Sequence, residues 1–297
     1  MLMDRQEFRD MEGLYAMTFS TNGERLFVGG RDGVHVWQME DGRRTAMMAT
    51  SSVVLCLAVS KDGRYLAGGA SWGDVIVWGA ETQEEVIKQK QDDKGINGVD
   101  FSPDSTQLVW ASDNGTATVW DLETNKQVQI IRHSHHDWVR VAKYSPEGNR
   151  IVTATHDSIR IHDSSNFRLL VDINTRVSPW RNPSLLYCID HLFVISGSNI
   201  IQLEATSGSL VSEWPVPGVS GSYSCIAQPK HGGCIAYSTD HTVSFWGTST
   251  HTQFSLIQHP EEIRSISVSP DDQFLAIGGR DGNIVIKSIS HIIVSTV

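Results

Sequence analysis

Short apolar segments alternate with polar turns along the chain, and residues 102–121 show the pattern most fully. Ser102–Asp104 has the composition of a β-turn, because proline fixes φ at the first central position and serine and aspartate cap nearby backbone groups. An apolar run follows at Leu108–Ala111. Asn114–Gly115 supplies the positive φ pair of a tight hairpin turn, and Thr116–Trp120 alternates as a strand. The stretch therefore predicts a turn, a strand, a hairpin and a second strand.

The same unit returns at a nearly constant interval. Positions equivalent to Trp120 recur every 41 to 43 residues, at Trp37, Trp78, His162, Leu203, Trp246 and Lys287. The preceding turn recurs too, starting at Ser20, Ser60, Ser145, Gln228 and Ser269. A period of about 40–45 residues with four short strands per unit is typical of a β-propeller blade. The sequence therefore predicts an all-β fold, a seven-bladed β-propeller with four antiparallel strands per blade.

At this point the chain resembles the WD40-repeat family. Trp120–Asp121 is the one copy of the dipeptide from which the family takes its name, while the resemblance in spacing covers essentially all 297 residues. The family's members are scaffolds, adaptors and recognition modules. The resemblance thus implies a non-catalytic protein that binds another protein or peptide, on the face formed by the d–a and b–c loops when the strands of each blade are lettered a to d from the channel outward.

We expect a single domain spanning residues 1–297, with blades near 14–50, 53–91, 96–132, 138–173, 184–216, 222–258 and 263–297. Two segments compete for the outer strand of the last blade. Residues 4–10 are favoured, because aligning Phe19–Ser20 on Phe101–Ser102 brings Arg5–Asp10 into register with an outer strand. Residues 291–297 are more apolar, but they follow Lys287 too closely to leave room for a turn.

Charge and composition narrow the class of protein. The chain carries 24 Lys and Arg against 34 Asp and Glu, a formal net charge of −10, which argues against general attraction to nucleic acid or anionic membranes. It contains no apolar run of about 18 residues, and Met1–Glu7 lacks the basic start and apolar centre of a secretory signal. We therefore expect a cytoplasmic protein, with no membrane partner and a monomeric state by default.

The four cysteines show no C-x-x-C spacing, so we expect free, buried thiols. Cys225 and Cys234 are the exception to consider, because they are candidates for neighbouring positions on paired strands.

Two segments resemble the sequence motifs of a catalytic site and of a metal site. Gly69–Gly73 matches the G-x-S-x-G of serine hydrolases, but it falls in a predicted b–c hairpin with no helix after it. His133–Asp137 is rich in metal-binding side chains but has no recognised ligand spacing. The family resemblance instead places His135 and His259 at the histidine that joins a buried chain of hydrogen bonds. We expect no catalytic residues, no metal and no cofactor.

The candidate binding residues lie on predicted d–a and b–c loops and at the start of strand a. They are Trp72, Trp138, Trp180, Arg31, Arg140, Arg264 and Arg280. Exposed aromatic side chains anchor protein interfaces, and guanidinium groups around a channel mouth suit a carboxylate or phosphate on a peptide. Each tryptophan could instead fold over an apolar rim, and the arginines could pair with Asp32, Asp281 and Glu261. A glycan-binding propeller is the alternative function, since tryptophan faces also stack on sugars.

Overall fold

The computed structural model describes residues 5–8, 13–133, 137–175, 177, 185–188, 190–216, 224–230 and 233–293. Within these residues, 28 strands form seven four-stranded antiparallel sheets, and one short helix, α1 (Ser290–Ile293), follows the last strand. The predicted seven-bladed β-propeller is thereby confirmed. The described residues include no helix with the length and hydropathy of a membrane span. The chain divides into two compact units, residues 1–54 with 218–297, and residues 55–217.

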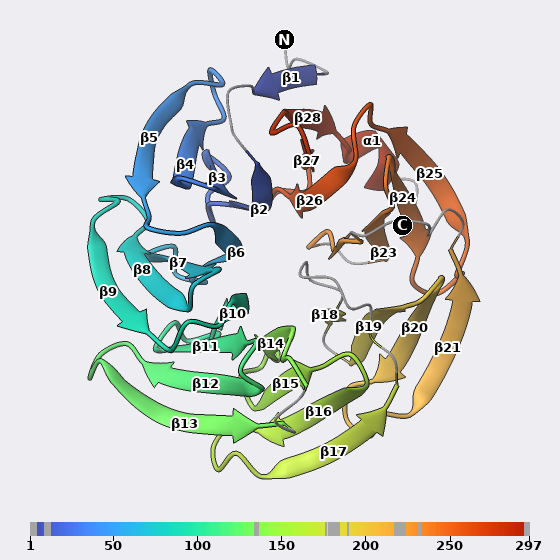
Figure 1. Cartoon of the computed structure of the whole chain (residues 1–297). Helices are drawn as coiled ribbons and strands as arrows, with labels where there is room; N and C mark the ends of the chain where they lie inside the picture. The colour runs from blue at the N-terminus through green and yellow to red at the C-terminus, as the bar shows by residue number, and fades with distance from the viewer. Residues whose placement is uncertain are drawn as a thin grey trace. The chain divides into compact units, whose positions relative to one another are not determined.

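The first unit holds three sheets, whose strands lie side by side in Figure 1. The first sheet consists of β2 (Leu14–Phe19), β3 (Arg25–Gly30), β4 (Gly33–Gln38) and β5 (Arg44–Ala49). The sixth consists of β22 (Ile226–Ala227), β23 (Cys234–Ser238), β24 (Thr242–Gly247) and β25 (Gln253–Gln258). The seventh consists of β26 (Ile263–Val268), β27 (Phe274–Gly279), β28 (Ile284–Ser288) and β1 (Arg5–Phe8).

The second unit holds the other four sheets. The second consists of β6 (Val54–Val59), β7 (Tyr65–Ala70), β8 (Asp74–Gly79) and β9 (Glu85–Lys90). The third consists of β10 (Ile96–Phe101), β11 (Gln107–Ser112), β12 (Thr116–Asp121) and β13 (Lys126–Arg132). The fourth consists of β14 (Val141–Tyr144), β15 (Arg150–Ala154), β16 (Ser158–Asp163) and β17 (Leu169–Asn174). The fifth consists of β18 (Leu185–Tyr187), β19 (His191–Ser196), β20 (Asn199–Glu204) and β21 (Leu210–Pro215).

The periodic positions seen in the sequence share one place in the strand register. Each lies on strand c and pairs with the second residue of strand b in its own sheet. The pairs are Trp37–Leu26, Trp78–Leu66, Trp120–Leu108, His162–Ile151, Leu203–Leu192, Trp246–Ile235 and Lys287–Leu275. The repeat length is therefore the number of residues between one position in a blade and the same position in the next blade.

Strand d of the seventh sheet comes from the N-terminal end of the chain. β1 pairs antiparallel with β28, with Phe8 opposite Ile284. This is the outer position that the register assigned to residues 4–10. The competing segment is not a strand where it is described, because residues 291–293 belong to α1; residues 294–297 lie outside the described residues.

Close contact between neighbouring sheets explains one glycine of the G-x-S-x-G match. A Cβ atom at Gly69 would lie 2.4 Å from Ile96 Cγ2 and 2.7 Å from Cys56 Sγ, too close for any side chain. Gly73 adopts a φ of +82° in the turn between β7 and β8. Both glycines are thus required by packing and turn geometry in the second sheet, and not by a nucleophile between them.

The four cysteines are free thiols, and burial raises the pKa of Cys56 to about 12 and that of Cys234 to about 11. The expectation that Cys225 and Cys234 are neighbours on paired strands is wrong. Cys225 lies opposite Ser238, whose N–H donates to the Cys225 carbonyl at 2.9 Å. That partner is at the far end of β23 from Cys234.

The a–b turns share a hydrogen-bond pattern that explains their sequence. In the third sheet Ser102 Oγ donates to Asp104 Oδ1 at 2.6 Å and accepts from the N–H of Gln107 at 2.9 Å. The same serine bond to the residue two positions later occurs at Ser20, Ser60 and Ser269. The serine thus closes the turn through its side chain before strand b begins.

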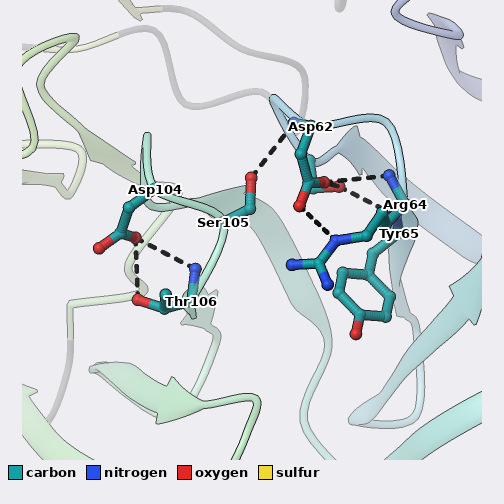
Figure 2. A network of polar contacts seen from close by, with 7 residues as sticks. Asp62, Arg64, Tyr65, Asp104, Ser105 and Thr106 are labelled. Atoms are coloured by element: carbon teal, nitrogen blue, oxygen red, sulfur yellow. Dashed lines mark hydrogen bonds and ion pairs between the residues drawn. The ribbon is translucent and has the colours of Figure 1, made fainter.

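The fourth residue of these turns has a positive φ, and in two blades it is not glycine. Ser105 has a φ of 61° and Asp272 a φ of 58°. Each side chain accepts a hydrogen bond from the preceding sheet's a–b turn: Asp62 N–H donates to Ser105 Oγ at 3.3 Å (Figure 2), and Lys230 N–H to Asp272 Oδ1 at 2.8 Å. In both units, the residue with positive φ in the a–b turn therefore accepts a hydrogen bond that joins two adjacent blades.

Candidate partner-binding surface

The b–c turns and the d–a loops lie at the same end of each sheet, because the four strands alternate in direction. In the second unit, that end carries two exposed tryptophans. Trp72 stands in the turn between β7 and β8 and is 62% exposed, and Trp138 precedes β14 and is 54% exposed. Neither side chain is folded over an apolar rim. The end of the second unit that bears Trp72 and Trp138 is called the tryptophan face below.

Trp138 is held in place by the arginine two residues later. The guanidinium carbon of Arg140 lies 4.5 Å from the centre of the Trp138 ring, within the range of a cation–π contact. Arg140 is only 9% exposed, and its Nη1 lies 3.4 Å from Asp113 Oδ1. The Trp138 ring therefore lies against the guanidinium group of a buried ion pair, while 54% of the residue stays exposed.

Asn97 fixes the carboxylate of that ion pair. Its Nδ2 donates to Asp113 Oδ1 at 2.7 Å and to the carbonyl oxygen of Val139 at 2.9 Å. Asn97 comes from the third sheet and Asp113 from its b–c turn. Both residues support the loop that carries Trp138. Sequence reasoning missed Asn97 and Asp113. The available signal was an amide side chain inside the apolar strand Ile96–Phe101.

This network changes the interpretation of Arg140. It was expected to point to a channel mouth and contact a partner, or to pair with Asp32, Asp281 or Glu261. Instead its guanidinium group contacts Asp113 and the Trp138 ring. Arg140 therefore positions the tryptophan from below.

Acidic side chains lie between the two tryptophans in the chain, on the d–a loop before β10. Asp92 accepts a hydrogen bond from Asn114 Nδ2 at 2.8 Å. Asp93 has a side chain that is 82% exposed and pairs with Lys90 at 3.2 Å. Lys90 also donates to the Trp72 carbonyl oxygen. The tryptophan face therefore combines exposed aromatic surface with carboxylates held by side-chain contacts.

The other three candidate arginines belong to the first unit. Glu262 contacts two of them, with Arg264 Nη2 at 3.6 Å and Arg280 Nη1 at 3.2 Å. Glu262 takes the place of the expected partners Asp281 and Glu261. Arg31 is exposed in the turn between β3 and β4, next to Asp32, whose carboxylate bonds to His35 Nε2 at 2.8 Å. Trp180 lies outside the described residues.

In the histidine-rich segment, His133 is described by the structure and is buried. His133 Nε2 lies 2.8 Å from Thr153 Oγ1, and desolvation, with the nearby positive charge of Arg160, lowers the pKa of His133 to about 4. The buried hydrogen bond expected at His135 stays a prediction, because His135 lies outside the described residues. No group of three or more metal-binding side chains was found in the part of the chain that the structure describes.

Comparison with known families gives matches along the repeats. The family model described as "WD domain, G-beta repeat" matches residues 44–79, 84–121, 125–163 and 250–286, which together make up just over half of the chain. The first three matched segments include the periodic residues Trp78, Trp120 and His162, and the fourth ends one residue before Lys287.

Individual relatives are distant and longer than this chain. A periodic tryptophan protein 2 homolog of Caenorhabditis elegans is 24% identical over 226 residues, covering 73% of this chain and 24% of the relative. Protein groucho of Drosophila melanogaster is 20% identical over 295 residues, covering 94% of this chain and 39% of the relative. The chain thus spans about a quarter to two fifths of the length of these relatives.

Among solved structures, a chain of the crystal structure of the Mitotic Checkpoint Complex superposes with a TM-score of 0.84 at 17% identity. The match covers 96% of this chain and 90% of that chain. At this identity the likeness establishes the fold.

Proposed function

The chain belongs to the WD40 family, and from that premise we propose that it is a non-catalytic scaffold that binds another protein or peptide through the tryptophan face. The observation that carries the proposal is that Trp138 is 54% exposed while Arg140, the group beneath it, is 9% exposed and ion-paired. A large aromatic side chain held rigid before binding loses little conformational entropy on contact, which favours its use as an interface anchor.

The surroundings of Trp138 suggest the chemistry of the partner. Asp92 and Asp93 add negative charge to the same end of the unit, and the whole chain carries a net charge of −10. Complementary charge steers association and selects partners. We therefore propose a segment with an apolar or aromatic side chain for Trp138 and basic side chains for the aspartates.

The name of the matching solved structure supports a scaffold role. The solved structure with the same fold is part of a Mitotic Checkpoint Complex, an assembly of proteins. Because the chain spans only part of its sequence relatives, the activities and partners of those longer proteins are not transferred to it.

Affinity capture from the native cell extract tests the proposal. The bait proteins are the wild type, Trp138→Ala, the double variant Trp72→Ala/Trp138→Ala, and Leu210→Ala as a matched control. Leu210 is a 59% exposed apolar residue on β21, away from the b–c turns and d–a loops. We expect the tryptophan variants to lose the same captured proteins, by at least tenfold, while Leu210→Ala retains them. Identical captures from all four baits would move the binding surface elsewhere.

The alternative of a glycan-binding propeller has a separate test. Sugar sites in propellers tend to repeat at equivalent positions, whereas Trp72 is in a b–c turn and Trp138 in a d–a loop. A glycan-array signal that is lost in Trp72→Ala would favour the alternative. Trp180, Arg31, Arg264 and Arg280 stay predictions as contact residues, and single alanine variants of each in the same capture would test them. Cytoplasmic localisation also stays a prediction.

A further inference from the structure

A cavity of about 380 Å³ lies at the a–b turn end of the second unit. A volume of this size is typical of small-molecule pockets. The a–b turns and the b–c turns lie at opposite ends of each antiparallel sheet, so the cavity is at the end away from the tryptophan face. Strand a of four consecutive sheets contributes to its lining, which includes Val59, Lys61, Asp100, Lys143, Leu186 and Tyr187.

Two opposite charges occupy the same register position in neighbouring sheets. Asp100 of β10 and Lys143 of β14 each pair with the third residue of strand b, as Leu186 does in the fifth sheet. The first and seventh sheets have Thr18 and Ser267 at the equivalent position. A charge at this position is therefore not a requirement of the fold, and its presence in two adjacent blades needs another explanation.

Asp100 is held by the backbone of the neighbouring sheet. Its Oδ2 accepts a hydrogen bond from the Tyr144 N–H at 2.9 Å. Burial raises the pKa of the Asp100 carboxyl group, although the positive charge of Lys143 and two backbone hydrogen bonds act in the other direction. A positively charged group of a ligand would favour the ionised carboxylate.

The two lysines of the cavity supply positive charge. Lys143 is half-buried and Lys61 is exposed. In the part of the second unit that the structure describes, no ion pair joins either ammonium group to a carboxylate. The charge of Lys143 thus acts on Asp100 without direct contact. The cavity therefore offers a ligand two separate charges of opposite sign.

Apolar and aromatic side chains make up much of the remaining wall. Leu186 and Tyr187 follow each other on β18, and both are half-buried. Tyr144, which also lines the cavity, is buried, and its hydroxyl donates to Gln107 Oε1 at 2.9 Å. Pockets of this kind enclose an apolar group while a few polar side chains fix its orientation.

We propose that this cavity binds a free α-amino acid with a large apolar side chain. The ammonium group of the ligand pairs with Asp100 and its carboxylate with Lys143, while Lys61 adds positive charge to the same cavity. Hydrogen bonds between charged groups are stronger than those between neutral groups. The apolar side chain of the ligand packs against Leu186 and Tyr187. The proposal does not depend on the tryptophan face, which lies at the other end of the sheets.

Calorimetric titration of the full chain with L-leucine tests the proposal. Two analogues each remove one charge: N-acetylleucine models the C-terminus of a peptide, and leucinamide models an N-terminus. Glycine keeps both charges and removes the apolar side chain. We expect saturable binding of leucine, and binding of each of the three control ligands at least tenfold weaker.

Variants of the chain locate the site. Lys143→Met keeps the stem and removes the charge, and Asp100→Asn keeps an acceptor for the Tyr144 N–H. Each should weaken the binding of leucine at least tenfold. Lys88→Met removes an exposed lysine from β9 of the same unit and should leave the affinity unchanged. Trp138→Ala should also keep full affinity, which separates this site from the proposed partner-binding surface.

The proposal would be overturned by the absence of saturable leucine binding, by equal affinity for any of the three control ligands, or by full affinity in a folded Lys143→Met or Asp100→Asn variant. If these variants fail to fold, the comparison of leucine with its analogues on the wild type decides alone. Loss of leucine binding in Trp138→Ala would also contradict the proposal, because that residue lies at the opposite end of the sheets.

Discussion

The rings of Phe8 and Trp37 lie nearly parallel, with their centroids 4.8 Å apart and an interplanar angle of 8°. Phe8 belongs to β1, the outer strand of the seventh sheet, and Trp37 to β4 of the first sheet. They are 2% and 7% exposed. This stack joins the sheet completed by the N-terminal strand to the sheet that begins the repeats, inside the first unit.

Replacing Phe8 with alanine should destabilise the protein by about 3 kcal/mol, because a buried aromatic ring and its stacking contact are lost together. Urea unfolding measures the change. Phe254→Ala is the matched control: Phe254 is 37% exposed on β25, an outer strand of the same unit, and should cost about 1 kcal/mol. Equal losses from the two variants would show that β1 is not anchored by Phe8.

Replacing Arg140 with methionine should cost about 2 kcal/mol, because the largely buried carboxylate of Asp113 loses the guanidinium group that balances its charge. The double variant Arg140→Met/Asp113→Asn should recover much of the loss, since the uncompensated charge is gone. A double-mutant cycle in denaturant unfolding measures the coupling. If the stability losses of the two single variants added up to that of the double variant, Arg140 and Asp113 would not be energetically coupled.

Substitutions of Ser105 test whether its hydrogen bond to the neighbouring blade compensates for the cost of its positive φ. Ser105→Ala keeps the φ of 61° but removes the acceptor for the Asp62 N–H, and should cost about 1 kcal/mol. Ser105→Gly also loses the bond but relaxes the backbone, and should be closer to neutral. Thermal unfolding of the two variants compares them. A glycine variant less stable than the alanine variant would contradict this account.

His133 should make stability depend on pH. Its pKa is lowered to about 4 in the folded protein from an ordinary value of 6.5, so between these values the unfolded state binds a proton that the folded state does not. Stability is therefore complete above about pH 6.5 and falls as the pH drops towards 4, by an amount on the order of 1–3 kcal/mol. Unfolding of the wild type and His133→Gln across this range measures the effect. The variant should lose less stability than the wild type.

Much of the fold could be predicted because repetition multiplies a weak local signal. Each periodic residue, from Trp37 to Lys287, returned to the same register position, and the turn signature at Ser102 and its equivalents preceded strand b as expected. The weakest predictions fell where the repeat is degenerate. Cys225 was misplaced relative to Cys234 because β22 is only Ile226–Ala227, shorter than the apolar run that predicted it.

The arrangement of the proposed tryptophan face was less predictable, because it depends on contacts between residues that are far apart in sequence. Exposed Trp72 and Trp138 could be proposed from loop positions, since turn residues face solvent. The pairing of Arg140 with Asp113 could not, because the choice among several carboxylates is made by side-chain direction and distance. The same limit explains why the contacts of Glu262 with Arg264 and Arg280 were not predicted.

The number of blades, their strand order and the acidic character of the chain follow from the amino-acid sequence alone, because periodicity, turn chemistry and charge are local or additive properties. The folded protein was needed to show that Arg140 lies against the ring of Trp138, that Phe8 stacks on Trp37, and that Nε2 of His259 is buried with no hydrogen-bond partner. These features arise where neighbouring sheets pack, and packing is set by the distances between side chains of different repeats, which no single repeat encodes.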